Sequence, residues 1–231
     1  MGYELDFSVV LSGRYFELFL RGLTMTFTLF ILGWVLGFVL ALILTVVRAA
    51  PVPPLRWLIA AYVEYHRNVP LLVQLFLWYF GMPQLLPRSI NSYLNSLNPE
   101  LGFAVIAIAC YMAAYMSEDF RSGLRAIPNA QREAARAMGF TFIQSMRWIL
   151  IPQAARLALP PLVNQTLHMF KGTSLAGIIG VAELTYMARQ IEDETFRVFE
   201  AFGLVTVTYL LCSFTLMLAG AALANRYRLR T

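Results

Sequence analysis

Long runs of apolar residues without a single charge dominate the pattern along this chain. No Asp, Glu, Lys or Arg occurs in residues 22–47, 68–87, 101–117 or 201–225, and Lys171 is the one charge within residues 157–182. About 20 apolar residues in a helix cross roughly 30 Å of hydrocarbon. The period-two alternation of a membrane β-barrel is missing from these runs. The sequence therefore predicts an all-α membrane protein with about five transmembrane helices.

We expect one membrane domain over residues 1–231. Its predicted spans are residues 22–47, 57–86, 101–120, 157–182 and 201–225, with a loop at residues 121–156. The chain is 59% hydrophobic and 13% charged, whereas soluble domains are roughly 25% charged. A net charge of +5 is too small to indicate nucleic-acid binding. Because Cys110 and Cys212 both lie in apolar runs, a disulfide or a thiolate zinc site is not expected.

The arginines predict the orientation. The N-terminal residues 1–21 contain three acids and no basic cluster, so we do not expect a cleavable signal peptide. With the N-terminus outside, eleven arginines flank the inner ends of the spans: Arg48, Arg56, Arg121, Arg125, Arg132, Arg136, Arg147, Arg156, Arg226, Arg228 and Arg230. Five then flank the outer ends, together with nine acids: Arg14, Arg21, Arg88, Arg189 and Arg197. The positive-inside rule favours an outside N-terminus and a cytoplasmic C-terminus.

The inner loop at residues 121–156 has helical signals of its own. Pro128 suits the first turn of a helix, where its missing N–H is not required. Gly139 is a stop signal, and Thr141 followed by Gln144 has the spacing of a capping box that opens a second helix. We therefore predict a helix, a glycine hinge and a short helix.

The first of these helices has a face of small residues. Ala130, Ala134, Ala137 and Met138 share that face, and we expect Arg132 and Arg136 beside it. Such a surface suits docking into a groove of another protein. A solvated basic loop that merely obeys the positive-inside rule is the alternative.

The same loop reads Glu133-Ala134-Ala135, then Gly139, then after nine residues Ile149-Leu150-Ile151-Pro152. This pattern resembles the EAA signature of permease subunits of binding-protein-dependent ABC importers. Ile151 replaces the usual leucine, which is a mild apolar change.

Two further stretches are similar to polar amino-acid permeases, and the resemblance covers nearly the whole chain. Arg67 to Gln74 with Tyr79-Phe80-Gly81 is similar to their second helix, and Lys171 to Leu175 with Ala182-Glu183-Leu184 to their fourth. Gly172 stands where a polar residue is more usual. Residues 67–74 with Leu85-Leu86-Pro87 look most like the glutamate/aspartate importers.

This resemblance implies the type I ABC importer fold and a set of partners in a bacterial inner membrane. The expected partners are a second permease chain, identical or paralogous, two ATP-binding subunits, a solute-binding protein outside the membrane, and lipid. Glu133, Ala134, Ala135, Gly139, Ile149 and Pro152 would form the contact that couples ATP-driven closure to the membrane helices. No phosphate loop occurs in this sequence. We therefore expect no catalytic residue and no cofactor on this chain, with ATP and Mg on the partner subunits.

Charges at membrane depth are candidate substrate contacts, because burying one in hydrocarbon is costly. Glu64 and Arg67 are three residues apart, so they either contact substrate or form a mutual ion pair. Lys171, beside Thr173 and Ser174, either attracts the carboxylates of an amino acid, pairs with another helix, or reaches an interface. His66 and His168 are interpreted as packing or hydrogen-bonding residues, so no metal site is predicted.

Pro70, Pro83 and Pro87 interrupt the second span, which either lines the translocation path or kinks for packing. Three functions stay open at this point. They are an ABC importer permease for a polar amino acid, a secondary amino-acid transporter, and a membrane assembly protein with a docking loop.

Overall fold

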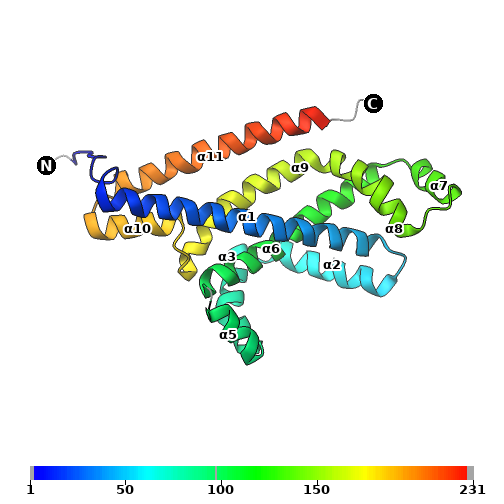
Figure 1. Cartoon of the computed structure of the whole chain (residues 1–231), viewed down its shortest axis with the longest axis horizontal. Helices are drawn as coiled ribbons and strands as arrows, with labels where there is room; N and C mark the ends of the chain where they lie inside the picture. The colour runs from blue at the N-terminus through cyan, green and yellow to red at the C-terminus, as the bar shows by residue number, and fades with distance from the viewer. Residues whose placement is uncertain (1–2, 97, 228–231) are drawn as a thin grey trace. The chain divides into compact units, whose positions relative to one another are not determined.

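The computed structural model describes residues 3–96 and 98–227, and all regular structure within them is helical (Figure 1). The first half contains α1 (Gly13–Ala49), α2 (Pro53–Asn68), α3 (Leu71–Phe76), the π-helical turn η1 (Leu77–Gly81), α4 (Met82–Leu85), α5 (Arg88–Ser96) and α6 (Pro99–Ala126). The second half contains α7 (Asn129–Ala137), α8 (Phe142–Ser145), the π-helical turn η2 (Met146–Leu150), α9 (Ile151–Gly172), the 3-10 segment η3 (Thr173–Ile179), α10 (Leu184–Thr195) and α11 (Val198–Tyr227). Arg228 and Arg230 lie outside the described residues.

The helices form two compact units. Unit 1 comprises Met1–Gly33, Leu71–Ile108 and Met169–Thr215. Unit 2 comprises Trp34–Pro70, Ala109–His168 and Leu216–Thr231. Four long helices, α1, α6, α9 and α11, therefore contribute residues to both units.

Within residues 3–96 and 98–227, three helices are long and apolar enough to cross a membrane by themselves: α1, α6 and α11. Each contains one of the predicted spans. The most apolar window of α6 is 61% buried, compared with 28% for α1 and 11% for α11. α6 is therefore the most buried of these three helices, and α11 is the least buried.

The second predicted span is not one helix. α2 ends at Asn68, and Val69 adopts an extended conformation with φ −103° and ψ 128°. The ring of Pro70 disfavours helical geometry at the residue before it. The short segments α3, η1 and α4 then occupy residues 71–85. The predicted interruption at Pro70 is confirmed, and the predicted span at residues 57–86 is corrected to α2, which ends at Asn68, and a separate run of α3, η1 and α4.

The fourth predicted span also has different boundaries. α9 begins at Ile151 and ends at Gly172, after which the chain tightens into 3-10 geometry as far as Ile179. α6 likewise continues to Ala126. The predicted loop at residues 121–156 is thus shortened to residues 127–150, because the helices extend beyond their apolar parts.

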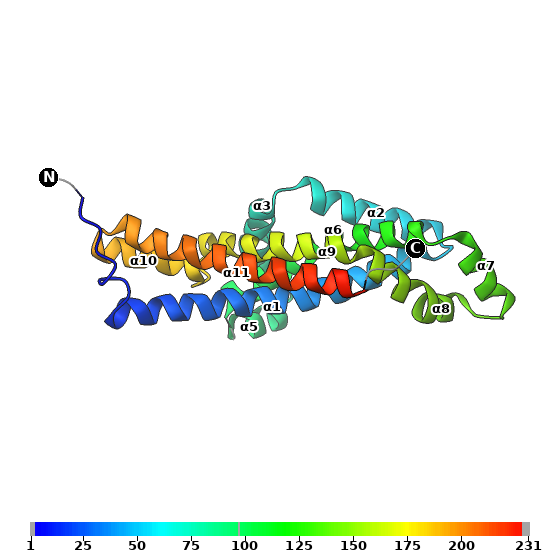
Figure 2. The same cartoon turned by 90° about the horizontal axis from the view of Figure 1, so that it is seen from above.

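Unit 1 has its own core where the N-terminal segment meets α1, α10 and α11 (Figure 2). Its buried residues are Val10, Phe19, Leu184, Ala188, Ile191, Ala201 and Val205. The fully buried Glu200 accepts hydrogen bonds from the Tyr3 hydroxyl and from the backbone N–H of Asp6 at 2.9 Å. The first of these bonds raises the pKa of Tyr3. Glu200 therefore fixes the N-terminal segment on the start of α11.

Unit 2 is held together by close contact of α6 with α9. Leu124, Ile127, Met146, Leu150 and Ala154 form a buried cluster there. Gly123 lies so near α9 that an added Cβ would stand 2.5 Å from the carbonyl oxygen of Ala154. Small residues allow this approach of two backbones in a membrane, where close packing rather than hydrophobic exclusion drives association.

Replacement of Gly123 by alanine should separate α6 from α9, because a backbone carbonyl cannot move away as a flexible side chain can. We expect Gly123→Ala to destabilise the assembled protein by about 1–3 kcal/mol, the usual cost of overpacking. Gly102→Ala on the same helix is the matched control, because its Cβ would meet only Leu94 Cδ2 at 3.9 Å. Thermal unfolding of the purified complex measures both. Equal melting temperatures for the two variants would contradict this assignment of the contact.

Candidate functional site

The segment between α6 and α9 has the predicted helix, hinge and helix. α7 starts at Asn129, with Pro128 in the N-cap position. Pro128 therefore precedes the first helical turn instead of lying in it. α7 and α8 extend beyond the ends of α6 and α9 in unit 2, as both views show (Figures 1 and 2).

The hinge at Gly139 needs glycine. Its φ is +79°, in the left-handed region that residues with a Cβ rarely adopt. The backbone N–H of Gly139 donates to the carbonyl oxygen of Arg136 at 2.9 Å, and the N–H of Phe140 donates to the carbonyl oxygen of Ala135 at 3.1 Å. These two bonds form the Schellman arrangement that ends a helix. The predicted stop at Gly139 is confirmed.

The predicted capping box at the start of α8 is also present. The Thr141 hydroxyl accepts from the N–H of Gln144 at 3.3 Å, and the Gln144 side chain accepts from the N–H of Thr141 at 2.8 Å. These two bonds satisfy donors that the first turn of a helix would leave unpaired. The turn between α7 and α8 is thus defined by local chemistry at both of its ends.

The residues of the EAA motif divide between the two sides of α7. Ala135 is fully buried, whereas Glu133 and Ala134 are exposed. The predicted small-residue face is likewise exposed, and it consists of Ala130, Ala134, Ala137 and Met138. The surface available to a partner therefore consists of Glu133 and this face.

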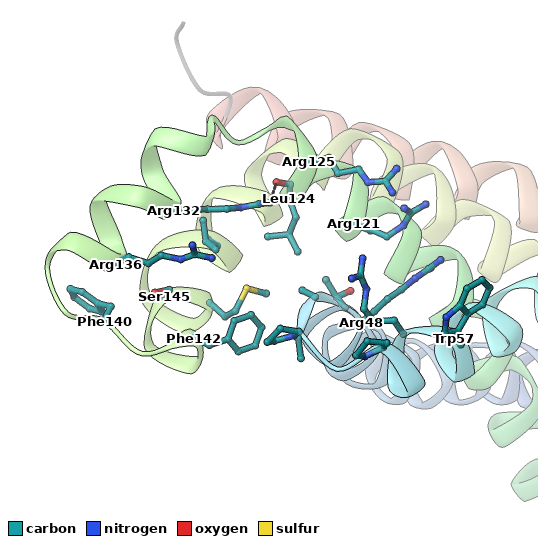
Figure 3. A pocket seen from close by; sticks show the side chains of 18 residues that line it. Arg48, Trp57, Arg121, Leu124, Arg125, Arg132, Arg136, Phe140, Phe142 and Ser145 are labelled. Carbon is teal, nitrogen blue, oxygen red and sulfur yellow. Dashed lines mark hydrogen bonds between the residues drawn. The ribbon is translucent and has the colours of Figure 1, made fainter.

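Arg132 and Arg136 are not beside the small-residue face as predicted. At 3.6 residues per turn they lie about 160° around α7 from Ala134. Both line a cavity of about 950 Å³ in unit 2, and Figure 3 shows them extending from α7 toward Arg48. α7 thus has an outward face of small residues and an inward face with arginines.

The last part of the motif anchors the segment in unit 2. Ile149 belongs to η2 and packs against the cluster that contains Leu150, and Pro152 is an exposed residue in the first turn of α9. Any movement of α7 must therefore be transmitted through η2 to α9 or through Ile127 to α6.

Glu64 and Arg67 do not pair with each other. The Glu64 carboxylate accepts from Asn68 Nδ2 at 3.1 Å, and the Arg67 guanidinium carbon lies 5.6 Å from the centre of the Tyr115 ring. The mutual ion pair is therefore not formed in this structure. His66 is buried with its ring 4.3 Å from that of Tyr62, which confirms a packing role. His168 is exposed, and its interpretation as a packing or hydrogen-bonding residue stays a prediction.

Arg67 belongs to a polar group that the sequence interpretation missed. Tyr111, Tyr115 and Asp119 are spaced four residues apart on α6. The Tyr111 hydroxyl donates a hydrogen bond to the Tyr115 hydroxyl at 3.2 Å. The Tyr115 hydroxyl in turn donates to the backbone carbonyl of Arg67 at 3.3 Å. One carboxylate oxygen of Asp119, Oδ2, is buried without a hydrogen-bond partner among the described residues. The four-residue spacing of these polar side chains was the signal that the sequence offered. Asp119 was missed because it lies just past the charge-free window, which ended at Ser117.

Lys171, Thr173 and Ser174 lie together in unit 1, so they are a separate group from Glu64 and Arg67 in unit 2. The Thr173 hydroxyl is buried and donates to the carbonyl of Phe170 at 2.7 Å, and the Ser174 hydroxyl donates to that of Lys171 at 2.8 Å. Lys171 is exposed in the last turn of α9. Within the described part of unit 1, no carboxylate lies within 4.0 Å of its ammonium group.

Comparison with known proteins decides the family. Residues 33–229 match the family of binding-protein-dependent transport system inner membrane components. The chain belongs to this family. It is a permease subunit of a polar amino-acid ABC importer of the inner membrane. This removes the secondary transporter and the assembly protein as alternatives.

The relatives carry several different names. The permease is 37% identical over 209 residues to a probable amino-acid ABC transporter permease protein, PatM, of Vibrio harveyi, covering 90% of this chain and 89% of that protein. It is 32% identical over 212 residues to the glutamate/aspartate import permease protein GltJ of Escherichia coli K12, covering 90% and 86%. It is 36% identical over 197 residues to the histidine/lysine/arginine/ornithine transport system permease protein HisM of Escherichia coli K12, covering 85% and 83%.

Solved structures agree on the fold. The permease matches a crystal structure of an amino acid ABC transporter with histidines at a TM-score of 0.82 and 32% identity, covering 97% of this chain and 100% of the other. A MetNI methionine ABC transporter in an inward-facing conformation matches at a TM-score of 0.71 and 20% identity, covering 94% and 100%, and shows the fold alone. The predicted type I ABC importer permease fold is confirmed.

Proposed function

We propose that this permease carries an acidic amino acid, glutamate or aspartate, into the cytoplasm. The observation that supports this most is Lys171, an exposed cation at the α9–η3 junction without a carboxylate partner among the described residues of unit 1. An unpaired ammonium group in a low-dielectric path attracts an anion more strongly than it would in water. The glutamate/aspartate permease among the relatives agrees with this choice, although a permease named for basic amino acids is also similar.

The proposed complex contains two permease chains, identical or paralogous, and two ATP-binding subunits that hold ATP and Mg. A solute-binding protein delivers the amino acid from outside. α11 has only 11% of its apolar window buried, so it leaves a large surface for lipid or a second permease chain. The asymmetry of the arginines supports an outside N-terminus, with α7 and α8 in the cytoplasm.

In this proposal α7 transmits the movement of the ATP-binding subunits. Its exposed small face can lie close to a partner, and Glu133 adds a charge at the edge of that face. Because η2 packs into the cluster between α6 and α9, displacement of α7 moves both membrane helices. Gly139 and the capping box hold α7 and α8 at a fixed turn, so the segment acts as one body.

Reversal of the charge at Glu133 should uncouple transport without unfolding the permease, because this side chain is exposed. We expect Glu133→Lys to lower uptake per ATP hydrolysed about tenfold or more, since like charges across an interface cost several kcal/mol. Ser122→Lys, which also introduces a lysine at an exposed position, on α6, should retain uptake. Uptake and ATP hydrolysis are both measured in proteoliposomes of the whole complex. Wild-type coupling in Glu133→Lys would exclude this contact.

Removal of the charge at Lys171 tests the substrate. In the reconstituted complex with its own binding protein, we expect uptake of labelled glutamate and aspartate to exceed that of glutamine, arginine and histidine. Lys171→Met should lower glutamate uptake about 10- to 100-fold, which corresponds to one or two lost charge contacts. Lys171→Arg keeps the charge and should keep most of the activity.

The same variants distinguish a substrate contact of Lys171 from a structural role. If Lys171 instead pairs with an acid elsewhere in the complex, Lys171→Met leaves that acid alone and should destabilise assembly by roughly 3–5 kcal/mol. An unchanged melting temperature with reduced glutamate uptake supports the substrate contact. Loss of assembly that is restored by neutralising an acidic partner would overturn it.

A further inference from the structure

The cavity lined by Arg132 and Arg136 of α7 has an unusual excess of positive charge. It has a volume of about 950 Å³, and its wall is formed by the end of α1, the start of α2, the end of α6 and the segment 132–150. Six arginines line it and no acidic residue does: Arg48, Arg56, Arg121, Arg125, Arg132 and Arg136. All of them belong to unit 2.

Glu118 on α6 compensates only part of this charge. It forms ion pairs with Arg48 and with Arg121, whose Nε donates to it at 2.7 Å. Arg132 donates to the carbonyl of Leu124 at 2.8 Å. Among the described residues, Arg56, Arg125 and Arg136 have no carboxylate within 4.0 Å. The cavity therefore has several positive charges that no carboxylate compensates.

Most of the rest of the wall is apolar, with Thr45 and Ser145 as the hydroxyl residues in it, and this favours a lipid over a soluble anion. Pro51, Pro53, Phe142, Met146 and Leu150 contribute hydrocarbon to the lining. Trp57 stands at the cavity with 78% of its surface exposed, and the next residue, Leu58, is 68% exposed. Exposed tryptophan next to arginine is typical of the membrane interface.

We propose that this cavity binds the phosphate headgroup of an anionic phospholipid from the cytoplasmic leaflet. Arg56, Arg125 and Arg136 contact the phosphodiester, and the acyl chains leave past Trp57 and Leu58. The inference rests on the orientation proposed above and not on the identity of the transported amino acid. Because Arg132 and Arg136 project from the inward face of α7, the lipid also holds α7 in place from behind while its small face remains free.

Native mass spectrometry of the whole complex from mixed phosphatidylglycerol and phosphatidylcholine nanodiscs tests this site. We expect wild type to retain phosphatidylglycerol and Arg125→Gln/Arg136→Gln to bind it about 30-fold more weakly, because each basic residue near an anionic surface contributes to affinity. Arg147→Gln/Arg156→Gln is the matched control, since these two arginines lie on η2 and α9 of the same unit and do not line the cavity. Equal loss of lipid in both double variants would reduce the effect to general surface charge and overturn the site.

Two further measurements identify the source of the anion. Phosphatidylglycerol, and not inorganic phosphate or glycerol phosphate, should raise the melting temperature of the wild-type complex in phosphatidylcholine nanodiscs, and this needs no variant. Equal stabilisation by a soluble phosphate would overturn the lipid assignment. If Arg125→Gln/Arg136→Gln keeps its lipid and instead loses the ATP-binding subunits, the cavity is a protein contact and the proposal is wrong. Lipid retention does not depend on glutamate uptake, so the two proposals fail separately.

Discussion

The contact of α6 with α9 is the constraint on which this permease depends. The segment that carries the EAA motif leaves α6 at Ala126 and re-enters α9 at Ile151. At that point Gly123 lies against the backbone of Ala154, and the cluster around Leu124 and Leu150 fills the space between the helices. Because the interior is closely packed, the segment cannot move by itself. In the proposed mechanism, a force on α7 is therefore transmitted to α6 and α9 at once.

The charged residues near this contact also connect helices to one another. Glu118 lies between Arg48 of α1 and Arg121 of α6, so it joins these helices where they leave the apolar region. A carboxylate removed from water is stable only when it is paired and hydrogen-bonded. One carboxylate cannot neutralise six arginines, and the excess of positive charge is what distinguishes this cavity from an ordinary basic loop.

The sequence predicts the parts of this structure that depend on local chemistry. Charge-free windows locate α1, α6 and α11, and Gly139 with Thr141 and Gln144 gives the turn between α7 and α8 at the correct residues. These features follow from capping bonds and left-handed backbone at single positions. The EAA spacing likewise identifies the family without any tertiary contact.

The remaining features depend on contacts between distant residues. The sequence could not show that Arg67 stacks on Tyr115 instead of pairing with Glu64, because that choice depends on how α2 packs on α6. Helix ends were misplaced because α6 and α9 continue as polar helices past the apolar windows used to find them. The helical period of 3.6 residues was enough to place the small residues and the arginines on opposite faces of α7. Only the structure shows that Arg132 and Arg136 line the same cavity.

Accessibility of α7 tests the central claim most directly. In a chain with Cys110 and Cys212 replaced by serine, Ala134→Cys places a thiol on the exposed small face, and Ser12→Cys places one near the N-terminus. A membrane-impermeant thiol reagent should label the first only in inside-out vesicles, with strong protection when the ATP-binding subunits are bound, and the second only in intact cells. Labelling of the thiol at position 134 from outside intact cells, or equal labelling with and without the ATP-binding subunits, would contradict the account.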